Sequence, residues 1–392
     1  MSSSPENLEG PVKHGTVREV ASVFLRLGLL AFGGAAGQIA MMRRELVQRR
    51  KWISEEDFLD LFGIMNLIPG PSATETAIAL GYARAGWPAL ILGGCLFVLP
   101  AMVCILALGW VYVRFGELPA VQVVLYGVNP IVIAIIADAL WSLGRAAIKN
   151  GWLALSGVAA LVLYFRGISI ELILIATVVL AAGIAFARRG KNQPRAMAPM
   201  LGIAAAQAAG AAAAAVPFSL TRLFLTFLKI GAISYGSGYV LLAFLHADFV
   251  TRLCWLTEKQ LLDSIAAGQI TPGPVFASAT FVGYITGGLN GALLATLGIF
   301  LPSFVFVAIV FPLVPKLKGS PAARAFLDII NASTMGLMAA VSWQMGRGAI
   351  IDAFTAVEAL VAFVILRRYQ INAALVIMAG VAAGVAMKFL TH

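Results

Sequence analysis

The chain has 392 residues, of which 60% are hydrophobic and only 12% are charged, and its mean hydropathy is +0.92. Soluble domains carry roughly 25% charged residues, and a chain of this length cannot hide so much apolar surface in a water-soluble core. The composition therefore excludes a soluble protein and indicates an integral membrane protein. The net charge of +10 comes from basic clusters between apolar runs, which is typical of membrane topology and of contacts with anionic lipid. We therefore expect the lipid bilayer, and no nucleic acid, as their partner.

Apolar runs of about 20 residues, rich in Leu, Ala, Ile and Val, predict membrane helices along most of the chain. Residues 1–16 precede the first run and are expected to form a short disordered tail. Residues 43–60 are basic and then acidic, with Trp52 as an expected anchor at the membrane interface. The apolar segments predicted in this half of the chain cover residues 17–42, 61–83, 87–112, 119–143, 150–165 and 168–187.

These segments form a first unit that covers residues 17–187, and a charged linker that contains proline follows it. The linker covers residues 188–216 and includes an Ala-rich apolar run at 200–216, which we expect to be an extra membrane helix. A second unit, residues 217–392, then repeats the pattern, with an interfacial piece at 250–262. Its predicted apolar segments cover residues 220–245, 263–286, 288–314, 322–345, 350–366 and 371–390.

The two units share residues at a nearly constant offset. An offset of 203 carries Trp52 onto Trp255 and Pro69-Gly70-Pro71 onto Pro272-Gly273-Pro274, and an offset of 202 carries Asn129 onto Asn331. Six segments per unit and the Ala-rich run make about 13 transmembrane segments, and an odd segment between the units turns the second one upside down. We therefore predict an all-α polytopic membrane protein built from two inverted repeats with broken helices. If the Ala-rich run does not span the membrane, the units are parallel instead.

The loop charges give an orientation with one conflict. With 13 segments, most basic loop residues fall on one side, which is expected to be cytoplasmic. They are Lys13, Arg18, Arg145, Lys149, Arg188, Arg189, Lys191, Arg195, Lys316, Lys318 and Arg324. The basic cluster at residues 43–51 would fall on the opposite side. Two explanations stay open: the first segment is a hairpin that returns to its starting side, or the cluster belongs to an amphipathic helix on the lipid surface.

Each unit contains the same two disruptions of its apolar segments, one rich in glycine and one with the sequence Pro-Gly-Pro. Proline removes a backbone donor and disfavours helix at the preceding residue. The half-helix that starts after such a break exposes free N–H groups, which favour an anion. One such break is commonly a simple kink, whereas two at matched positions favour a substrate site between the units. The candidate substrate-binding residues at these breaks are Gly33, Gly34, Pro69, Gly70, Pro71, Ser72, Thr74, Gly236, Ser237, Pro272, Gly273 and Pro274.

Three of the charged residues within the apolar segments are candidates for function. Arg26 and Lys229 occupy matched positions, and charges at membrane depth are costly and usually functional. They are candidates for a positive pocket that suits a tetrahedral dianion, with snorkelling to the lipid headgroups as the alternative. Glu75 follows Pro71 by one turn, and its counterpart is Ser278. This carboxylate is a candidate for proton coupling or for pairing with a cation such as Arg26 or Arg84.

The break motifs resemble those of the chromate ion transporter family. The resemblance rests on Phe32-Gly33-Gly34, on residues 67–71 with Thr74 and Glu75 after them, and on residues 268–274. It covers essentially the whole chain in the long, two-unit form. It implies a bacterial inner-membrane carrier that exports chromate and confers chromate resistance, with sulfate as an expected competitor or alternative substrate. Short members of the family have one unit and act in pairs, so a homodimer is a further expectation.

Three alternatives to chromate export stay open at this point. The first is a carrier that takes up sulfate or another oxyanion, and the second is a passive anion channel. The third, a membrane-bound reductase, is disfavoured because the sequence has no CxxC pair, no haem-ligand pair and no dinucleotide-binding glycine loop. Its three cysteines, Cys95, Cys104 and Cys254, are scattered. We therefore expect a transporter without cofactor, metal or enzymatic activity.

Overall fold

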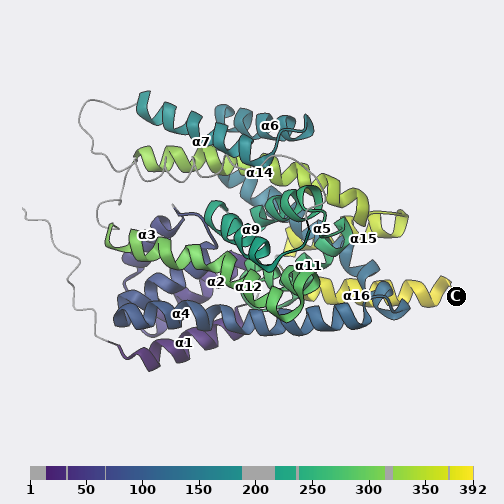
Figure 1. Ribbon diagram of the computed structural model, residues 1–392, viewed down its shortest axis with the longest axis horizontal. Coiled ribbons are helices and arrows are strands. Elements are labelled where there is room, and N and C mark those ends of the chain that lie inside the picture. The colour runs from purple at the N-terminus through teal and green to yellow at the C-terminus, as the bar shows by residue number, and fades with distance from the viewer. Residues whose placement is uncertain are drawn as a thin grey trace, which may run out of the picture.

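The computed structural model describes residues 15–31, 34–66, 68–187, 217–234, 238–313, 321–369 and 371–391. These residues form helices and no strands, which confirms the all-α prediction. The predicted Ala-rich helix at 200–216 and most of the predicted tail lie outside the described residues. In Figure 1 the long arm of α4 runs along the long axis of the molecule, and the C-terminus lies at one end of this axis.

The same series of elements occurs in both units. The first unit contains α1 (Val17–Leu30), α2 (Gly34–Met42), the π-helix η1 (Arg43–Arg49), α3 (Glu55–Met65), α4 (Ser72–Phe115), α5 (Pro119–Ala147), α6 (Gly151–Phe165) and α7 (Ile170–Ala187). The second contains α9 (Leu220–Ile233), η2 (Gly238–Val240), α10 (Leu241–Leu245), the π-helix η3 (His246–Arg252), α11 (Glu258–Ile270), η4 (Val275–Ala277), α12 (Ser278–Val310), η5 (Phe311–Leu313), α14 (Pro321–Ala349), α15 (Ala353–Tyr369) and α16 (Ala373–Thr391). The chain therefore consists of two homologous units.

Helices α4 and α12 each fold back on themselves. The backbone leaves helical geometry at Ala85 and Gly86 in α4, and Gly86 has a φ of 71°. Before this turn, Gly81 packs against the carbonyl of Ala89, which lies after it, so the two arms of α4 run antiparallel. The backbone of α12 reverses its direction in the same way at Gly288, which has a φ of 61°.

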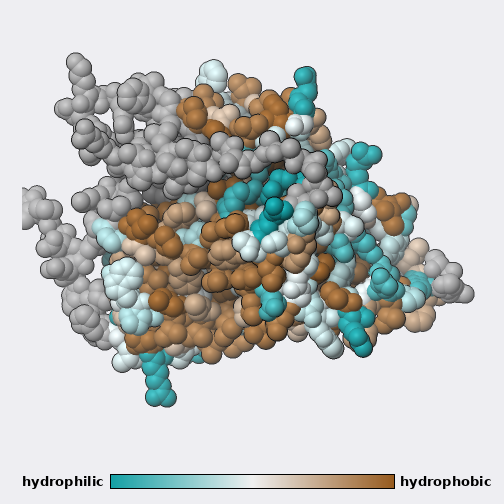
Figure 2. Space-filling model, in the orientation of Figure 1, coloured by the Kyte–Doolittle hydropathy of each residue, from teal (hydrophilic) through white to brown (hydrophobic). Residues whose placement is uncertain are grey.

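Long apolar helices are present in both units. Among the described residues, Ser72–Phe115, Pro119–Ala147 and Val275–Val310 are long and apolar enough to cross a membrane, and Gly151–Phe165 and Ala373–Phe389 are shorter apolar helices. Large apolar side chains remain exposed on them, at a four-residue spacing on α12: Leu289, Leu293, Leu297 and Leu301. Figure 2 shows a broad apolar surface of this kind, which fits contact with lipid chains.

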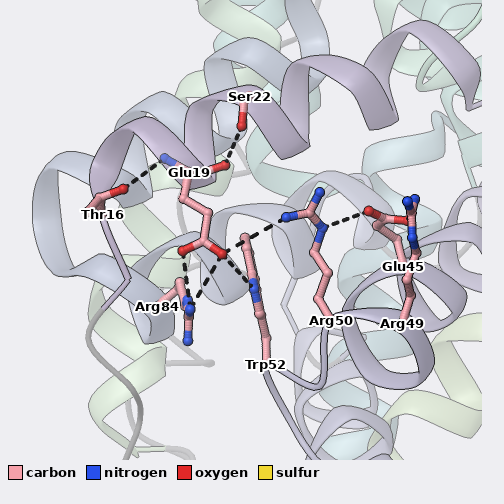
Figure 3. A network of polar contacts seen from close by, with 8 residues as sticks. All are labelled: Thr16, Glu19, Ser22, Glu45, Arg49, Arg50, Trp52 and Arg84. Atoms are coloured by element: carbon pink, nitrogen blue, oxygen red, sulfur yellow. Dashed lines mark hydrogen bonds and ion pairs between the residues drawn. The ribbon is translucent and has the colours of Figure 1, made fainter.

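The first apolar segment is a hairpin that returns to its starting side. Glu19, in the first turn of α1, accepts a hydrogen bond from Trp52 Nε1 at 3.2 Å and pairs with Arg84 at 3.1 Å (Figure 3). Arg50, which follows η1, lies 4.0 Å from the same carboxylate. The beginning of α1, the residues after η1 and the end of the first arm of α4 therefore meet at one end of the molecule. We call this the near end and the opposite one the far end.

This hairpin removes the conflict in the loop charges. The basic cluster at residues 43–51 now lies toward the near end, together with Arg18. The next segment also returns to its starting side, because α3 begins after Trp52 and the first arm of α4 ends at Arg84, whose guanidinium lies 4.9 Å from the Trp52 ring. Each broken segment of the first unit thus enters from the near end and turns back at its break.

The two units are inverted relative to each other. Helix α5 ends where its counterpart α14 begins, since Lys149 pairs with Asp328 at 2.7 Å, and further along Ile133 of α5 packs on Gly346 of α14. These equivalent helices are therefore antiparallel. The two-fold axis that relates them must run across the helices, in the plane of the membrane. This geometry confirms the inverted repeat and excludes the parallel alternative.

The units also interleave. Helix α14 of the second unit packs against α6 and α7 of the first, and α5 of the first packs against α15 and α16 of the second. Figure 1 shows α14 beside α6 and α7. One hydrophobic core, which includes Ile135, Phe227 and Met338, contains residues of both units. The site described next lies where the two units join.

Candidate functional site

The breaks of both units meet at one cavity of about 450 Å³. The first residues of α2 and α4 line it from the first unit, and those of η2 and η4 line it from the second. Helix α5 and the turn between α15 and α16 complete the wall. The lining residues are Gly34, Ala35, Ala36, Gln38, Pro71, Ser72, Ala73, Ile135, Asp138, Ala139, Ser142, Leu143, Gly238, Tyr239, Gln269, Pro274, Val275, Phe276, Leu366, Ile371, Asn372 and Ala373.

Two reciprocal hydrogen bonds hold the breaks together. The N–H of Gly70 donates to the carbonyl of Ser234 at 2.7 Å, and the N–H of Gly273 donates to the carbonyl of Ala31 at 2.9 Å. Each bond joins the Pro-Gly-Pro break of one unit to the glycine-rich break of the other, and the 203-residue offset relates them. Gly70 and Gly273 have φ values of 134° and 108°, a region that only glycine enters without strain. The glycines therefore shape both breaks.

Four helix beginnings line the cavity at these breaks. They start near Gly34, Ser72, Gly238 and Val275. The first N–H groups of a helix have no partner within the helix, and the helix dipole adds partial positive charge there. Such ends bind anions in many proteins. The cavity thus has the backbone chemistry of an oxyanion site, contributed by both units.

The cavity also has polar side chains that the sequence reasoning did not select. Gln38 donates through Nε2 to the carbonyl of Gly273 at 2.6 Å, and the buried side chain of Gln269 interacts with the hydroxyl of Tyr239. Asp138 lies 3.8 Å from Arg367, and Tyr239 completes this group. The signal for them was their polarity within apolar runs, which usually marks function in membrane proteins.

The predicted break residues fall into four groups. Gly34, Pro71, Ser72 and Pro274 line the cavity, while Thr74 is fully buried behind it and its Oγ1 has no partner among the described residues. Pro69, Gly70, Pro272 and Gly273 form the breaks themselves without appearing in the cavity wall. Gly33, Gly236 and Ser237 lie outside the described residues.

The two matched cations lie away from the cavity wall. Arg26 is exposed on α1. Lys229 is half-buried, and its Nζ lies 3.0 Å from Glu171 Oε1 and 2.7 Å from Asp248 Oδ2. The same carboxylate of Asp248 also pairs with Arg252 at 2.7 Å. Lys229 is therefore already neutralised by carboxylates.

Glu75 is fully buried behind the first break. Its Oε1 accepts a hydrogen bond from Ser303 Oγ at 3.3 Å, and its Oε2 has no partner among the described residues. Arg84, one of the predicted cation partners, binds Glu19 instead. Within the described part of the chain, the carboxyl group of Glu75 therefore contacts the hydroxyl of Ser303, which belongs to the second unit, rather than a cation.

The fold and this shared cavity define a polytopic membrane protein of the two-unit transporter type. The family model described as "Chromate transporter" matches the chain twice, at residues 18–187 and 221–385, so the chain belongs to the chromate transporter family. The boundaries of these two matches agree with the two units of the structure.

The chain is similar to chromate transport proteins over nearly its full length, and to a shorter transporter over one unit. It is 34% identical to the chromate transport protein of Cupriavidus metallidurans over 94% of this chain and 92% of that protein. It is 32% identical to the chromate transport protein of Pseudomonas aeruginosa over 92% and 90%. The uncharacterized transporter YwrA of Bacillus subtilis is 29% identical over 35% of this chain but 80% of its own length, which makes it the size of one unit. No solved structure matches the chain.

Proposed function

We propose that this protein is a secondary transporter that exports chromate across the inner membrane of the cell and so confers chromate resistance. One observation carries the proposal: matched helix breaks of both inverted units meet at a single cavity lined by four helix beginnings. This is the arrangement in which secondary transporters hold a substrate, and helix N-termini favour an anion. The names of the relatives supply the identity of that anion.

The charge distribution supports export from the cytoplasm. The basic cluster at residues 43–51, Lys149 and Arg367 all belong to the near end, and an excess of Lys and Arg marks the cytoplasmic side. The cavity reaches the exposed residues Ile371 and Asn372 in the turn that follows Arg367, so it opens toward the near end. A dianion that enters there gains about 2.3 kcal/mol per charge per 100 mV on leaving a negative-inside cell.

The chemistry of the site restricts the alternatives. Sulfate has the same tetrahedral shape and charge as chromate, so it is the expected competitor. A passive channel would need a continuous path, whereas the cavity opens to one end. The proposed cycle leaves the chromium unreduced and requires no cofactor, which separates it from a reductase.

The proposal predicts lower chromate accumulation in cells that make the protein. Radiolabelled chromate in washed cells measures this, with total chromate in the culture as the control for reduction. Replacing Gln269 by Leu removes a buried amide donor from the cavity wall, and a hydrogen bond to a charged group contributes about 1.5–3 kcal/mol. We therefore expect binding at least about tenfold weaker and loss of protection. Trp152→Ala, at a side chain that is 80% exposed on α6, is the matched control and should protect normally.

Three results separate the alternatives. Saturable flux with counter-transport supports a carrier, and single-channel currents would favour a channel. Stronger transport of sulfate than of chromate, directed inward, would favour uptake. Unchanged chromate accumulation with full-length protein in the membrane would refute export.

A further inference from the structure

Among the described residues, the cavity reaches exposed positions at the near end, although the two units are related by symmetry. Its α5 wall ends at Ser142 and Leu143, and its mouth lies at the turn that contains Asn372. All three belong to the near end. The inverted repeat places an equivalent path on the opposite side of the breaks, toward the far end. The residues of that second path can be identified by the offset of 202.

The counterparts of the open wall are closely packed. Residues Ile135, Ala139 and Leu143 of α5 line the cavity. Their counterparts on α14 are Leu337, Val341 and Met345, which are 1%, 0% and 0% exposed. The clearest difference is at Leu143, which is half-buried, whereas its counterpart Met345 is 0% exposed, so this position of the far path is covered.

A hydrogen bond closes the far path where the near path is open. Ser142 and Leu366 both line the cavity, and the offset carries them onto Gln344 and Tyr164. The hydroxyl of Tyr164 donates to Oε1 of Gln344 at 2.7 Å, so this bond joins α6 to α14. The same hydroxyl lies 3.4 Å from His246 Nδ1. The near end offers no equivalent bond, because a leucine and a serine occupy the two positions.

An ion pair adds a second closure. Lys229 of α9 binds Glu171 at the beginning of α7 and Asp248 of η3. The counterpart of Glu171 is Ala373, which lines the open cavity, and the counterpart of Lys229 is the exposed Arg26. The charged contact thus exists on the closed side and has no equivalent on the open side.

We propose that Tyr164 with Gln344, and Lys229 with Glu171, form a gate that closes the far end in this conformation and opens when the substrate leaves there. The inference rests on the proposed carrier function, which requires access to alternate between the two ends. It assigns the matched cation Lys229 to gating rather than to the substrate pocket.

Far-side labelling of a cavity cysteine tests the gate without using chromate. The probe is Ala139→Cys in a chain whose Cys95, Cys104 and Cys254 are replaced by Ala, treated in intact cells with a membrane-impermeant maleimide. Tyr164→Phe and Gln344→Ala each remove the gate hydrogen bond, which contributes about 1 kcal/mol. Each should raise the far-side labelling rate about fivefold. Trp152→Ala, at an exposed position of α6 away from both the cavity and the gate, should leave this rate unchanged.

A reversible cross-link tests the gate during transport. In the same cysteine-free chain, Tyr164→Cys and Gln344→Cys are joined by a short bifunctional thiosulfonate reagent. Chromate flux should fall at least about tenfold and recover with reductant, while chromate binding in detergent persists. Unchanged far-side labelling in both hydrogen-bond variants, or normal flux through the cross-linked protein, would overturn the gate. Failure of the unmodified protein to bind or move chromate would instead refute the proposed function, because the labelling result stands without chromate.

Discussion

Glu75 and Ser303 show how single residues make the two halves of a symmetric site different. Glu75 corresponds to Ser278, and Ser303 corresponds to Ala101. The contact between Glu75 and Ser303 at 3.3 Å therefore has no symmetric copy. Since both side chains lie immediately behind the break at Gly70, the carboxyl group stands next to the break of the first unit, and a serine takes its place in the second.

We predict that Glu75→Gln uncouples transport from protons. The amide is nearly isosteric and can still bond the Ser303 hydroxyl, so the free energy of unfolding should change by no more than about 1 kcal/mol. Chromate binding should remain, whereas acceleration of flux by an imposed pH gradient in proteoliposomes should be lost. Ser303→Ala keeps the carboxyl group and serves as the control, which should retain the gradient effect. Equal acceleration of the Gln variant would exclude Glu75 as the coupling residue.

Helix α1 shows why matched positions in the sequence do not bring the two cations to the cavity wall. Their depth along the sequence is the same, but depth alone does not fix which face of a helix a residue occupies. Val23, Phe24 and Leu27 form the buried face of α1, while Arg26 lies on the exposed face. A helical period of 3.6 residues separates these faces, so the pattern of α1 already contained this information.

The breaks themselves are elements that the sequence predicts well, because glycine and proline act locally. Their partners are not local. The contacts of Gly70 with Ser234 and of Gly273 with Ala31 join segments about 200 residues apart in the chain. The polar wall contributed by Asp138 and Gln269 also depends on how α5 and α11 pack. Local chemistry therefore predicted the breaks, and only the packing identified the other residues that line the cavity between them.

At the breaks, we predict that Gly70→Ala damages the site more than Pro71→Ala. The φ of 134° at Gly70 is strained for any L-residue, at a cost of about 1–3 kcal/mol, and an added Cβ would contact Glu75 and Ser303. The glycine preserves the break even without proline, so Pro71→Ala should weaken binding less. Thermal unfolding and chromate binding in detergent measure both effects.

Gly63→Ala is the matched control for this comparison. Gly63 lies in the neighbouring helix α3, where an added Cβ would meet nothing within 4 Å. Alanine is favoured over glycine inside a helix by about 1 kcal/mol, so this variant should unfold at the same or a higher temperature. If Gly70→Ala behaved like Gly63→Ala, the conformation assigned to the first break would be wrong.

At the scale of the whole molecule, the inverted repeat predicts that equivalent loops face opposite sides of the membrane. Lys51 and Cys254 are such a pair, since the 203-residue offset relates them. They share an unusual backbone, with φ values of 52° and 54°, directly before Trp52 and Trp255. Both side chains are exposed. The chain therefore contains a natural cysteine at the far end and a position for an engineered one at the near end.

We expect Cys254 to react with a membrane-impermeant maleimide in intact cells, in a chain with Cys95→Ala and Cys104→Ala. The matched variant, which adds Lys51→Cys and Cys254→Ala, should react only after the membrane is permeabilised, because the near end carries the basic cluster and such clusters are expected on the cytoplasmic side. The fraction of protein labelled before and after permeabilisation measures this. Labelling of both cysteines from the same side would mean that the units are parallel, and then neither the one-sided cavity nor the gate at its far end could result from their symmetry.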